Sequence, residues 1–420
     1  MKLKHLKTVF NNHNSFFTNV LWQYLLQLSK YVLPFLLFPY LTRILLPDSF
    51  ANYIYITTFM GVAQSFIDFG FNLYGTAIVT KSLNDKKEVE AIIAQITYAR
   101  AAIGIGGLVI ILIATTFIDI LSENFLFSIF SYLAVAFTAI LPDFVFQSYE
   151  KMRALTTRFI LVKSVALIGV IVFVRDSDDL YLIGLINFIC AVLGYIWTIW
   201  AISSIFNLEV NWHSCRHIFT RIRKSALYCF SNISTILFDS FTTLSIGVVL
   251  TNKADLAYWG VGITAIGAVQ ALYAPIMNSL YPHVLRNKNI NFALRLGLVS
   301  LPVLIIGTIA FIYYSDLITL ILGGPSYGKA ANVMIWLSPI LLISFYGILI
   351  GWPVLGAVGE VRGLTFSTYF AGLANVFLMG GIIICGIDSL ILICYIRVLI
   401  ELILLVSRGL VLCRYLKNKT

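Results

Sequence analysis

Long apolar runs follow one another along the whole chain, and this pattern leaves few folds open. An α-helix of about 20 apolar residues crosses the hydrocarbon core of a bilayer, and a window of about 19 residues finds about twelve such runs. They lie at about 16–41, 51–73, 91–117, 125–148, 157–175, 181–204, 225–250, 256–280, 291–314, 331–353, 364–386 and 389–413. The sequence therefore predicts an all-α membrane protein with twelve transmembrane helices.

The composition excludes a soluble protein. The 420 residues are 60% hydrophobic and 11% charged, whereas charged residues make up about 25% of a soluble domain. A net charge of +10 would suggest nucleic acid or an acidic partner in a soluble chain. In a membrane protein the position of that charge matters more, and we expect the lipid bilayer as a partner and no nucleic acid.

Lysine and arginine gather on alternate loops. Of the 29 such residues, about 22 lie in the two terminal segments and in every second loop, and about four lie in the opposite loops. Because positively charged loops stay in the cytoplasm, we expect both termini there. The six runs within 1–204 then form an N-terminal bundle, those within 225–420 form a C-terminal bundle, and 205–224 is a basic cytoplasmic linker.

The sequence indicates no cofactor, metal site or catalytic centre. The six cysteines form no C-x-x-C pair, and His213 and His217 lack an evident third ligand. The stretch GGPSYGKA has Ala330 where a phosphate-binding loop needs Ser or Thr, and it follows a membrane helix. A chain with two similar halves and no nucleotide site is typical of a secondary transporter, with its binding site near mid-depth between the halves.

The first apolar run has one polar face. Its polar positions are Asn19, Gln23, Gln27, Lys30 and Pro34, which fall within an arc of about 80° at 100° per residue. A cation near mid-depth costs about 2.5–3.5 kcal/mol, so such a residue faces protein or water. The stripe predicts that this helix lines a polar pathway.

A second helix repeats the design about half the chain later. Between 225 and 250 the polar positions include Tyr228, Asn232, Thr235, Asp239 and Thr242, again within an arc of about 80°. The charged residue at the centre of this stripe is the acid Asp239. Each predicted half therefore opens with a striped helix.

Charges inside the predicted spans favour an anionic substrate. Lys30, Arg100 and Arg397 form a cationic set suited to a phosphate or pyrophosphate group, because arginine gives bidentate contacts and lysine a point charge. Asp239 is an acid suited to proton linkage. Asp68 and Asp143 lie near the cytoplasmic ends of their helices, where water is within reach.

Structural roles stay open for two of these cations. Lys30 is also compatible with an ion pair to a carboxylate on a neighbouring helix. Arg397 and Glu401 are spaced i, i+4 on the last helix, so they are able to neutralise each other. Glu401 freed from Arg397 is a second candidate for ion coupling.

Four stretches resemble the O-antigen (Wzx-type) flippases of the multidrug/oligosaccharidyl-lipid/polysaccharide (MOP) superfamily. Residues 33–53, LPFLLFPYLTRILLPDSFANY, are similar to the family pattern PYLxRxLGpxxfG, although Leu46 and Ala51 stand where glycine is usual. Residues 68–72 (DFGFN) and 146–152 (FQSYEKM, with Ser148 for glycine) resemble two further elements. Residues 272–282, LYAPIMNSLYP, resemble its proline-rich helix end.

This resemblance implies two six-helix bundles around a central V-shaped cavity with alternating access, as in multidrug (MATE-like) transporters of the superfamily. It implies that the substrate is an undecaprenyl-pyrophosphate-linked oligosaccharide repeat unit, such as an O-antigen unit of lipopolysaccharide. That unit moves from the cytoplasmic to the periplasmic leaflet of a bacterial inner membrane. A polysaccharide polymerase and a chain-length regulator are candidate protein partners.

The resulting hypothesis assigns roles to single residues. The cationic set attracts the pyrophosphate, the polar stripes hydrate the sugars, and Asp239 or Glu401 couples the cycle to protons or another ion. The candidate substrate-binding residues are Lys30, Arg100, Arg397, Asn19, Gln23, Gln27, Asn232 and Thr235. The candidate gate or structural residues are Arg43, Asp68, Asp143 and Glu150.

Three other functions are alternatives to this hypothesis. A multidrug cation antiporter of the same superfamily predicts that acidic groups alone control activity. A membrane polysaccharide polymerase usually has a large outward loop, whereas the longest one here is 315–330. A passive scaffold or channel leaves the charges inside the spans without a purpose.

Overall fold

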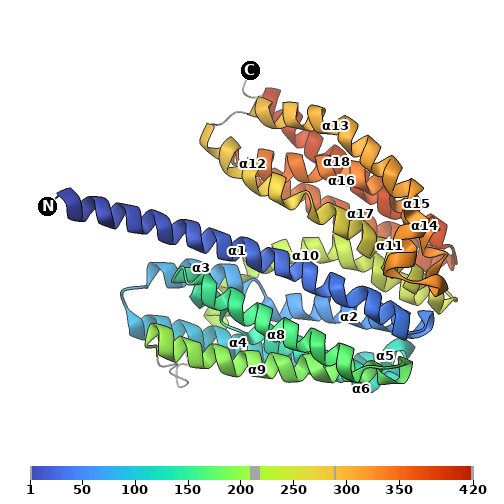
Figure 1. Ribbon diagram of the computed structural model, residues 1–420, viewed down its shortest axis with the longest axis horizontal. Coiled ribbons are helices and arrows are strands. Elements are labelled where there is room, and N and C mark those ends of the chain that lie inside the picture. Colours follow the sequence, from blue (N-terminus) through green and yellow to red (C-terminus); the bar gives the residue numbers. More distant parts are fainter. Residues whose placement is uncertain (1, 209–217, 288–289, 418–420) are drawn as a thin grey trace. The chain divides into compact units, whose positions relative to one another are not determined.

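The computed structural model describes residues 2–208, 218–287 and 290–417, and every regular element in these ranges is helical (Figure 1). In chain order the elements are α1 (Lys2–Ile44), α2 (Pro47–Asp68), α3 (Phe71–Lys81), α4 (Lys86–Ala114), α5 (Asp119–Glu123), α6 (Phe125–Ile140), α7 (Asp143–Ser148), α8 (Met152–Phe173), the short 3₁₀ helix Ser177–Asp179, α9 (Leu180–Phe206), α10 (Ile218–Val249), α11 (Lys253–Ala271), α12 (Ala274–Asn287), α13 (Ile290–Tyr313), α14 (Ser315–Leu322), the 3₁₀ helix Pro325–Tyr327, α15 (Ala330–Leu337), α16 (Pro339–Leu349), a π-helical segment Ile350–Gly356, α17 (Val361–Cys385) and α18 (Leu390–Lys417). The predicted all-α class is confirmed.

Ten helical segments of the described chain are long and apolar enough to cross a membrane. Each coincides with one of the predicted runs. The runs at 51–73 and 225–250 correspond to α2 and α10, which are not among the ten, although α10 contains a shorter apolar segment at Ile236–Val249. The count of twelve spans therefore stays a prediction.

The chain forms two compact units. The first unit contains Met1–Leu37 and Met60–Asn232, and the second contains Phe38–Phe59 and Ile233–Thr420. Helices α1, α2 and α10 each contribute residues to both units. We describe each unit by itself.

Two predicted runs are interrupted by turns in the first unit. The run at 51–73 ends at Asp68, because Phe69 and Gly70 have φ angles of 46° and 73° and turn the chain into α3. Glycine adopts this left-handed conformation without a steric cost, so a D-F-G sequence suits the turn. The run at 125–148 is divided into α6 and α7 at Leu141 and Pro142.

The fifth predicted run, at about 157–175, is part of a helix that starts earlier. Helix α8 begins at Met152, and Arg158 and Lys163 lie inside it. The polar residues of its first turns had lowered the local hydropathy. One of these residues, Thr156, donates its hydroxyl hydrogen to the Trp22 carbonyl over 2.9 Å.

The core of the first unit lies among α3, α4, α7 and α9. Phe71, Ile93, Phe144 and Phe146 are fully buried there. A Cβ at Gly75 on α3 would come within 2.7 Å of the Phe144 ring, so glycine is what allows α3 and α7 to pack this closely. Helices α6, α8 and α9 lie beside one another and extend this packing (Figure 1).

In the second unit the tenth predicted run is a broken helix. α16 passes into the π-helical segment at Gly351, whose ψ of −119° is not helical, and Pro353 lacks the N–H that an α-helix needs. The guanidinium of Arg408 on α18 donates to the Gly347 carbonyl over 2.6 Å and to the Thr368 hydroxyl over 3.1 Å. Arg408 therefore satisfies a backbone carbonyl beside the break.

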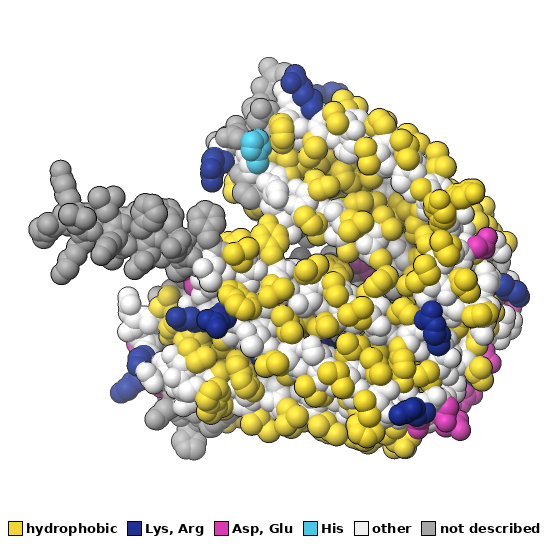
Figure 2. Space-filling model, in the orientation of Figure 1, with side chains coloured by type: hydrophobic (Ala, Val, Ile, Leu, Met, Phe, Trp, Pro, Cys, Tyr) yellow, Lys and Arg dark blue, Asp and Glu magenta, His cyan; other side chains and the backbone are white. Residues whose placement is uncertain are grey.

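The surface of both units suits a lipid environment. Figure 2 shows apolar side chains over most of the visible face, with most charged side chains near the ends of the helices. Of the residues in the most apolar part of α13, 11% are buried inside the protein. Large apolar side chains that are exposed to this extent require a hydrocarbon environment.

Candidate functional site

The polar stripe of α1 is exposed beside the face that packs on the first unit. Leu26 is buried in the core of this unit, and Trp22 packs against that core. Gln23, Gln27 and Lys30 are exposed. Because each stripe residue follows a packed residue by one position, the stripe lies about 100° around the helix from the packed face.

Lys30 has no ion pair or hydrogen bond within the part of the chain that the structure describes. The structural alternative, a lysine tied to a carboxylate on a neighbouring helix, has no support among these residues. On the opposite edge of α1 the exposed side chains are apolar, as Leu28 and Val32 illustrate. The charge therefore lies on the polar edge of a span whose other edge suits lipid.

Asn19, at the start of the stripe, forms a hydrogen bond between α1 and α8. Its side-chain carbonyl accepts a hydrogen bond from the Met152 N–H over 3.4 Å. One turn further along both helices, Thr156 donates to the Trp22 carbonyl. Asn19 thus has a structural contact, while Gln23 and Gln27 stay exposed.

Arg100 is enclosed within the first unit. Its side chain is fully buried on α4, it forms an ion pair with Asp68 at the end of α2, and it donates to the Leu141 carbonyl over 2.9 Å. The Phe71 and Phe144 rings lie 5.8 Å from its guanidinium carbon. These contacts occupy the cation and fix the DFGFN turn, so we do not include Arg100 in the proposed binding set.

Asp143 belongs to a second arginine–aspartate pair. Arg158 on α8 contacts both of its carboxylate oxygens, over 2.6 and 3.0 Å, and donates to the Thr198 hydroxyl on α9 over 2.9 Å. A bidentate pair of this kind fixes relative geometry. It connects α7, α8 and α9, which agrees with the structural alternative for Asp143.

Glu150 lies in the turn between α7 and α8. Its φ of 54° is left-handed, its side chain is exposed, and its N–H donates to the Gln147 carbonyl over 3.1 Å. The next N–H, that of Lys151, donates to the Phe146 carbonyl over 2.8 Å. The FQSYEKM stretch is therefore a helix-ending turn that starts α8.

In the second unit the structure brings three of the predicted residues together. The Arg397 guanidinium on α18 lies 3.5 Å from an Asp239 oxygen on α10 and 3.2 Å from a Glu401 oxygen. Its guanidinium carbon lies 4.6 Å from the centroid of the Phe238 ring. The side chains of Arg397 and Glu401 are 7% and 6% exposed, whereas that of Asp239 is 56% exposed.

The arrangement is a buried cation between one buried and one exposed carboxylate. Arg397 Nη1 is buried and has no hydrogen-bond partner in the described chain. The two carboxylates and the one guanidinium give this group a net charge of about −1 when both acids are ionised. The group can therefore exchange an ion or a proton at its exposed member.

Helix α17 holds the α10 side of this group. Asn375 is fully buried; its amide donates to the Leu237 and Phe238 carbonyls over 3.0 and 3.3 Å and accepts from Thr242 over 3.1 Å. Gly372 lies one turn away, where a Cβ would be 3.0 Å from the Leu237 Cβ and 3.2 Å from a backbone carbonyl. Sequence reasoning missed Asn375, although an isolated amide in the 364–386 run was a signal.

Two predicted residues of the second stripe, Asn232 and Thr235, have side chains outside the described part of the chain. Their proposed contacts with sugar therefore stay predictions. Thr242, in the same stripe, is buried against α17. Among the stripe residues with described side chains, Asp239 is the exposed one.

Arg43 connects the end of α1 to the end of α14 within the second unit by hydrogen bonds. It donates to the Pro39 carbonyl over 2.6 Å and to the Ile321 carbonyl over 3.0 Å. The buried Tyr327 hydroxyl donates to the Leu45 carbonyl over 3.1 Å. Burial raises the pKa of Tyr327 far above its usual value of 10.0, so this hydroxyl keeps its proton. Hydrogen bonds therefore connect the PYLTRIL stretch at the end of α1 to the end of α14 and the GGPSYGKA loop that follows it.

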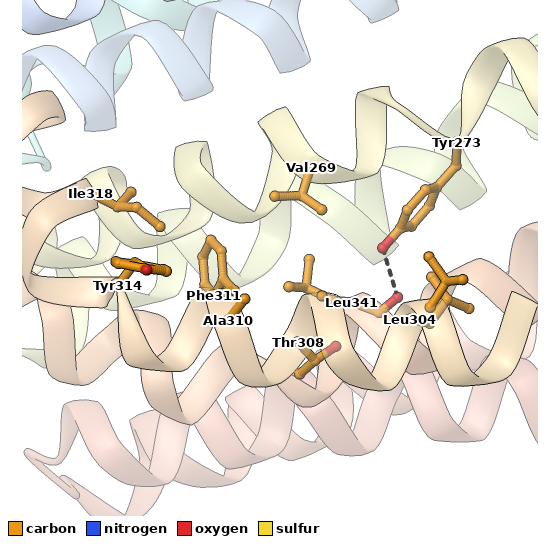
Figure 3. Close-up of a pocket in the computed structure, with 11 residues that line it drawn as sticks. Val269, Tyr273, Leu304, Thr308, Ala310, Phe311, Tyr314, Ile318 and Leu341 are labelled. Atoms are coloured by element: carbon orange, nitrogen blue, oxygen red, sulfur yellow. Dashed lines mark hydrogen bonds between the residues drawn. The ribbon is translucent and has the colours of Figure 1, made fainter.

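A separate hollow of about 280 Å³ lies in the second unit among α11, α13, α14 and α16 (Figure 3). Its walls are apolar, with Val269, Leu304 and Phe311 among them. The Tyr273 hydroxyl donates to the Leu341 carbonyl over 2.9 Å. No predicted site residue lines this hollow, and its chemistry suits a hydrocarbon rather than a sugar or a phosphate.

Comparison with known sequences gives a family match over most of the chain. Residues 16–288 match the model of a family described as polysaccharide biosynthesis protein. An Escherichia coli (strain K12) protein named as a candidate O-antigen transporter is 26% identical over 352 residues, which are 79% of this chain and 82% of that protein. A Shigella dysenteriae protein with the same name is 19% identical over 326 residues, or 75% and 80% of the two chains.

Two solved structures share the fold. The lipid II flippase MurJ, in an inward closed conformation, aligns with a TM-score of 0.72 at 12% identity over 94% of this chain and 87% of its own. An inward-facing multidrug resistance MATE family transporter of the MOP superfamily aligns with a TM-score of 0.68 at 12% identity, over 91% and 92%. These similarities confirm the predicted MATE-like helical fold.

Proposed function

Because the chain belongs to the polysaccharide biosynthesis protein family, we propose that it is a flippase for a lipid-linked oligosaccharide. Its substrate is an undecaprenyl-pyrophosphate-linked repeat unit, an O-antigen unit or a similar glycan. The protein moves this unit from the cytoplasmic to the periplasmic leaflet of a bacterial inner membrane. The relatives that match over most of their length are named as transporters, which agrees with the prediction of a transporter rather than an enzyme.

The observation that carries this proposal is the exposed stripe on α1. Gln23, Gln27 and Lys30 are exposed on one edge of a helix long enough to cross the membrane. Amide side chains replace the water around sugar hydroxyls, and an ammonium group attracts the phosphate anion. A polar, positively charged edge at membrane depth serves a polar anionic headgroup better than it serves structure.

The proposed topology has twelve spans with both termini in the cytoplasm. Residues 1–204 and 225–420 form the two six-helix halves, joined by the basic linker 205–224, and transport proceeds by alternating access. Lys30 attracts the pyrophosphate, and Arg397, which is held between Asp239 and Glu401, is left out of the binding set as Arg100 is. Asn19, Gln23, Gln27, Asn232 and Thr235 hydrate the sugars. Asp239, which shares Arg397 with Glu401, couples the cycle to protons or sodium ions.

A flippase-null strain provides the test. We expect the wild-type chain to restore surface polysaccharide, and Lys30→Ala to reduce the restored amount by about tenfold, since a charge-assisted contact contributes about 1.5–3 kcal/mol. Lys30→Arg should retain most of the activity because it keeps the charge. Leu28→Ala, on the apolar edge of the same helix, is the matched control. Correctly inserted Lys30→Ala that restores full polysaccharide would reject the role of Lys30.

The nearest alternative is a multidrug cation antiporter of the same superfamily. The observation in its favour is the exposed carboxylate of Asp239. That function requires dye efflux to rise with expression of the chain, and it requires Lys30→Ala to leave efflux unchanged. A flippase requires neither dye efflux that rises with expression nor efflux that is unchanged by Lys30→Ala.

A further inference from the structure

Lys163 lies at the middle of a membrane-spanning helix. It is the twelfth of the 22 residues of α8, so about 15 Å of helix separates it from either end. A lysine near a helix end extends its ammonium group to the interface. From the middle of the span the side chain needs a counter-charge, water or an anionic ligand instead.

Two arginines that lie well inside the first unit's spans have counter-charges. Arg100 is paired with Asp68, and Arg158 with Asp143. Within the described residues no carboxylate pairs with Lys163 or with Lys30. Lys163 and Lys30, which both lie near the middle of their spans, therefore have no carboxylate partner among these residues.

Lys163 does not point to lipid. Thr156 and Val170 lie seven residues before and after it, on nearly the same face of the helix, and both are buried. The exposed apolar residues of α8 that suit lipid, Leu161 and Ile168, lie about 140–160° away around the helix. Lys163 is nevertheless exposed, on the face of α8 that contains these two buried residues.

Two hydrogen bonds give the register between α8 and α1. Asn19 contacts Met152 and Trp22 contacts Thr156, so the numbering of both helices rises in the same direction with an offset of 133 to 134 residues. Seven residues beyond Thr156, this offset places Lys163 level with residues 29 and 30 of α1. The two unpaired lysines are therefore at the same depth, and Lys30 is exposed on the neighbouring helix.

We propose that Lys163 and Lys30 together form a diphosphate-binding site in the first unit, in which Lys163 distinguishes a lipid diphosphate from a lipid monophosphate. This inference rests on the proposed function. Two ammonium groups at one depth match the two charged phosphates of a diphosphate, whereas a monophosphate satisfies one of them. Lysines hold a phosphate as point charges without the fixed fork of arginine, which suits a group that has to be released.

Binding to the purified full-length protein in nanodiscs tests the site. The probes are undecaprenyl diphosphate and undecaprenyl monophosphate. We expect the wild-type chain to bind the diphosphate more tightly, and Lys163→Gln to weaken diphosphate binding by about tenfold with about a twofold effect on the monophosphate. Lys163→Arg should retain the preference. Lys81→Gln, an exposed lysine at the end of α3, controls for general surface charge.

The outcomes separate this inference from the proposed function. If the wild-type chain binds the diphosphate and Lys163→Gln binds both lipids as the wild type does, the two-lysine site is rejected and the flippase proposal stands. If the wild-type chain binds neither lipid, both proposals are rejected. An equal loss for both lipids rejects the discriminating role of Lys163.

A second measurement needs no variant and therefore no assumption about folding. We expect Lys163 in the wild-type protein to react with a water-soluble acylating reagent, and undecaprenyl diphosphate to protect it, as read by mass spectrometry of the peptides. Lys81 should react equally with and without the lipid. A Lys163 that stays unmodified while Lys81 reacts, or one that the diphosphate does not protect, contradicts the proposal.

Discussion

Arg397 has two acidic neighbours that differ in their access to water. Glu401 is buried beside it, while more than half of the Asp239 side chain is exposed. Removing one partner from a buried ion pair costs about 3–5 kcal/mol, so we assign Glu401 to holding Arg397 in place. We therefore propose that Asp239 is the member that exchanges a proton, and that its neutral form interacts more weakly with Arg397.

This assignment predicts the behaviour of Asp239→Asn, which mimics the protonated acid permanently. In proteoliposomes, an imposed proton gradient should raise the initial transport rate of the wild-type chain severalfold. The variant should transport at a low rate that the gradient does not change, because the exchangeable group is gone. The measurement is the ratio of the rates with and without the gradient.

Asp316→Asn is the control for the loss of an acid, since Asp316 is exposed at the start of α14, outside the spans. It should respond to the gradient as the wild type does. An unchanged gradient response in Asp239→Asn would place the coupling elsewhere. A response to a sodium gradient alone would identify the ion as sodium.

Sequence reasoning identified the charged residues of the spans but not all of their partners. Arg397 and Glu401 share one helix turn, so their spacing predicted the pair that the structure contains. Arg100 is paired with Asp68, 32 residues away, and periodicity does not reveal a contact between two separate helices. Lys163 was not identified, although the predicted run at 157–175 contains it.

Helix α10 is positioned by the close approach of α17. Gly372 allows the backbones to meet, and three residues later Asn375 binds the carbonyls of Leu237 and Phe238. Asp239 and Phe238 follow directly on α10, so the same junction sets where both meet Arg397. The contact between α10 and α17 thus holds the exposed carboxylate of Asp239 in its position.

Gly372→Ala should therefore disturb the junction. Its Cβ would meet the backbone carbonyl of Ser234 at 3.2 Å and the Leu237 Cβ at 3.0 Å, so α17 has to shift by a few tenths of an ångström. We expect a lower thermal unfolding midpoint, by several degrees for a loss of about 1–2 kcal/mol. Transport should fall with it, because the Asn375 hydrogen bonds lengthen.

Gly380→Ala is the matched control on the same helix. A Cβ at this position meets nothing within 4 Å, and alanine is about 1 kcal/mol better than glycine in a helix interior. The unfolding midpoint should stay the same or rise. Equal effects of the two substitutions would mean that the close approach at Gly372 does not hold α10.

At the scale of elements, hydropathy predicted the existence of the helices better than their interruptions. Each run coincides with helix because every backbone group within a bilayer needs an internal partner. The breaks depend on special backbone positions, such as the left-handed φ of Phe69 and Gly70 and the unusual ψ of Gly351. Those angles are fixed by tertiary contacts, among them the Arg408 bond to Gly347.

For the whole molecule, the number of spans depends on α2 and α10. The 22 residues of α2 extend about 33 Å, enough to cross a bilayer, but its polar side chains lower its hydropathy. In α10 the apolar segment Ile236–Val249 is too short to cross by itself, so the crossing of α10 depends on the residues before it. In α2 the polar side chains are the reason that hydropathy alone does not identify a span.

The locations of three loops distinguish twelve spans from the alternatives. If α2 and α10 both cross, residue 84 is cytoplasmic and residues 122 and 316 are periplasmic. If only α2 fails to cross, all three locations invert. If only α10 fails, residue 316 alone changes side, and if both fail, residues 84 and 122 exchange sides while 316 stays periplasmic.

Single cysteines at these positions, in a chain whose own six cysteines are replaced by alanine, provide the measurement. In spheroplasts, an impermeant maleimide should label Ser122→Cys and Asp316→Cys, and should label Asn84→Cys after the membrane is opened. The three native side chains are exposed, so a lack of labelling reflects the side of the membrane and not burial. Because the positive charges are concentrated on every second loop only when both helices cross, labelling of Asn84→Cys from outside would overturn the twelve-span topology.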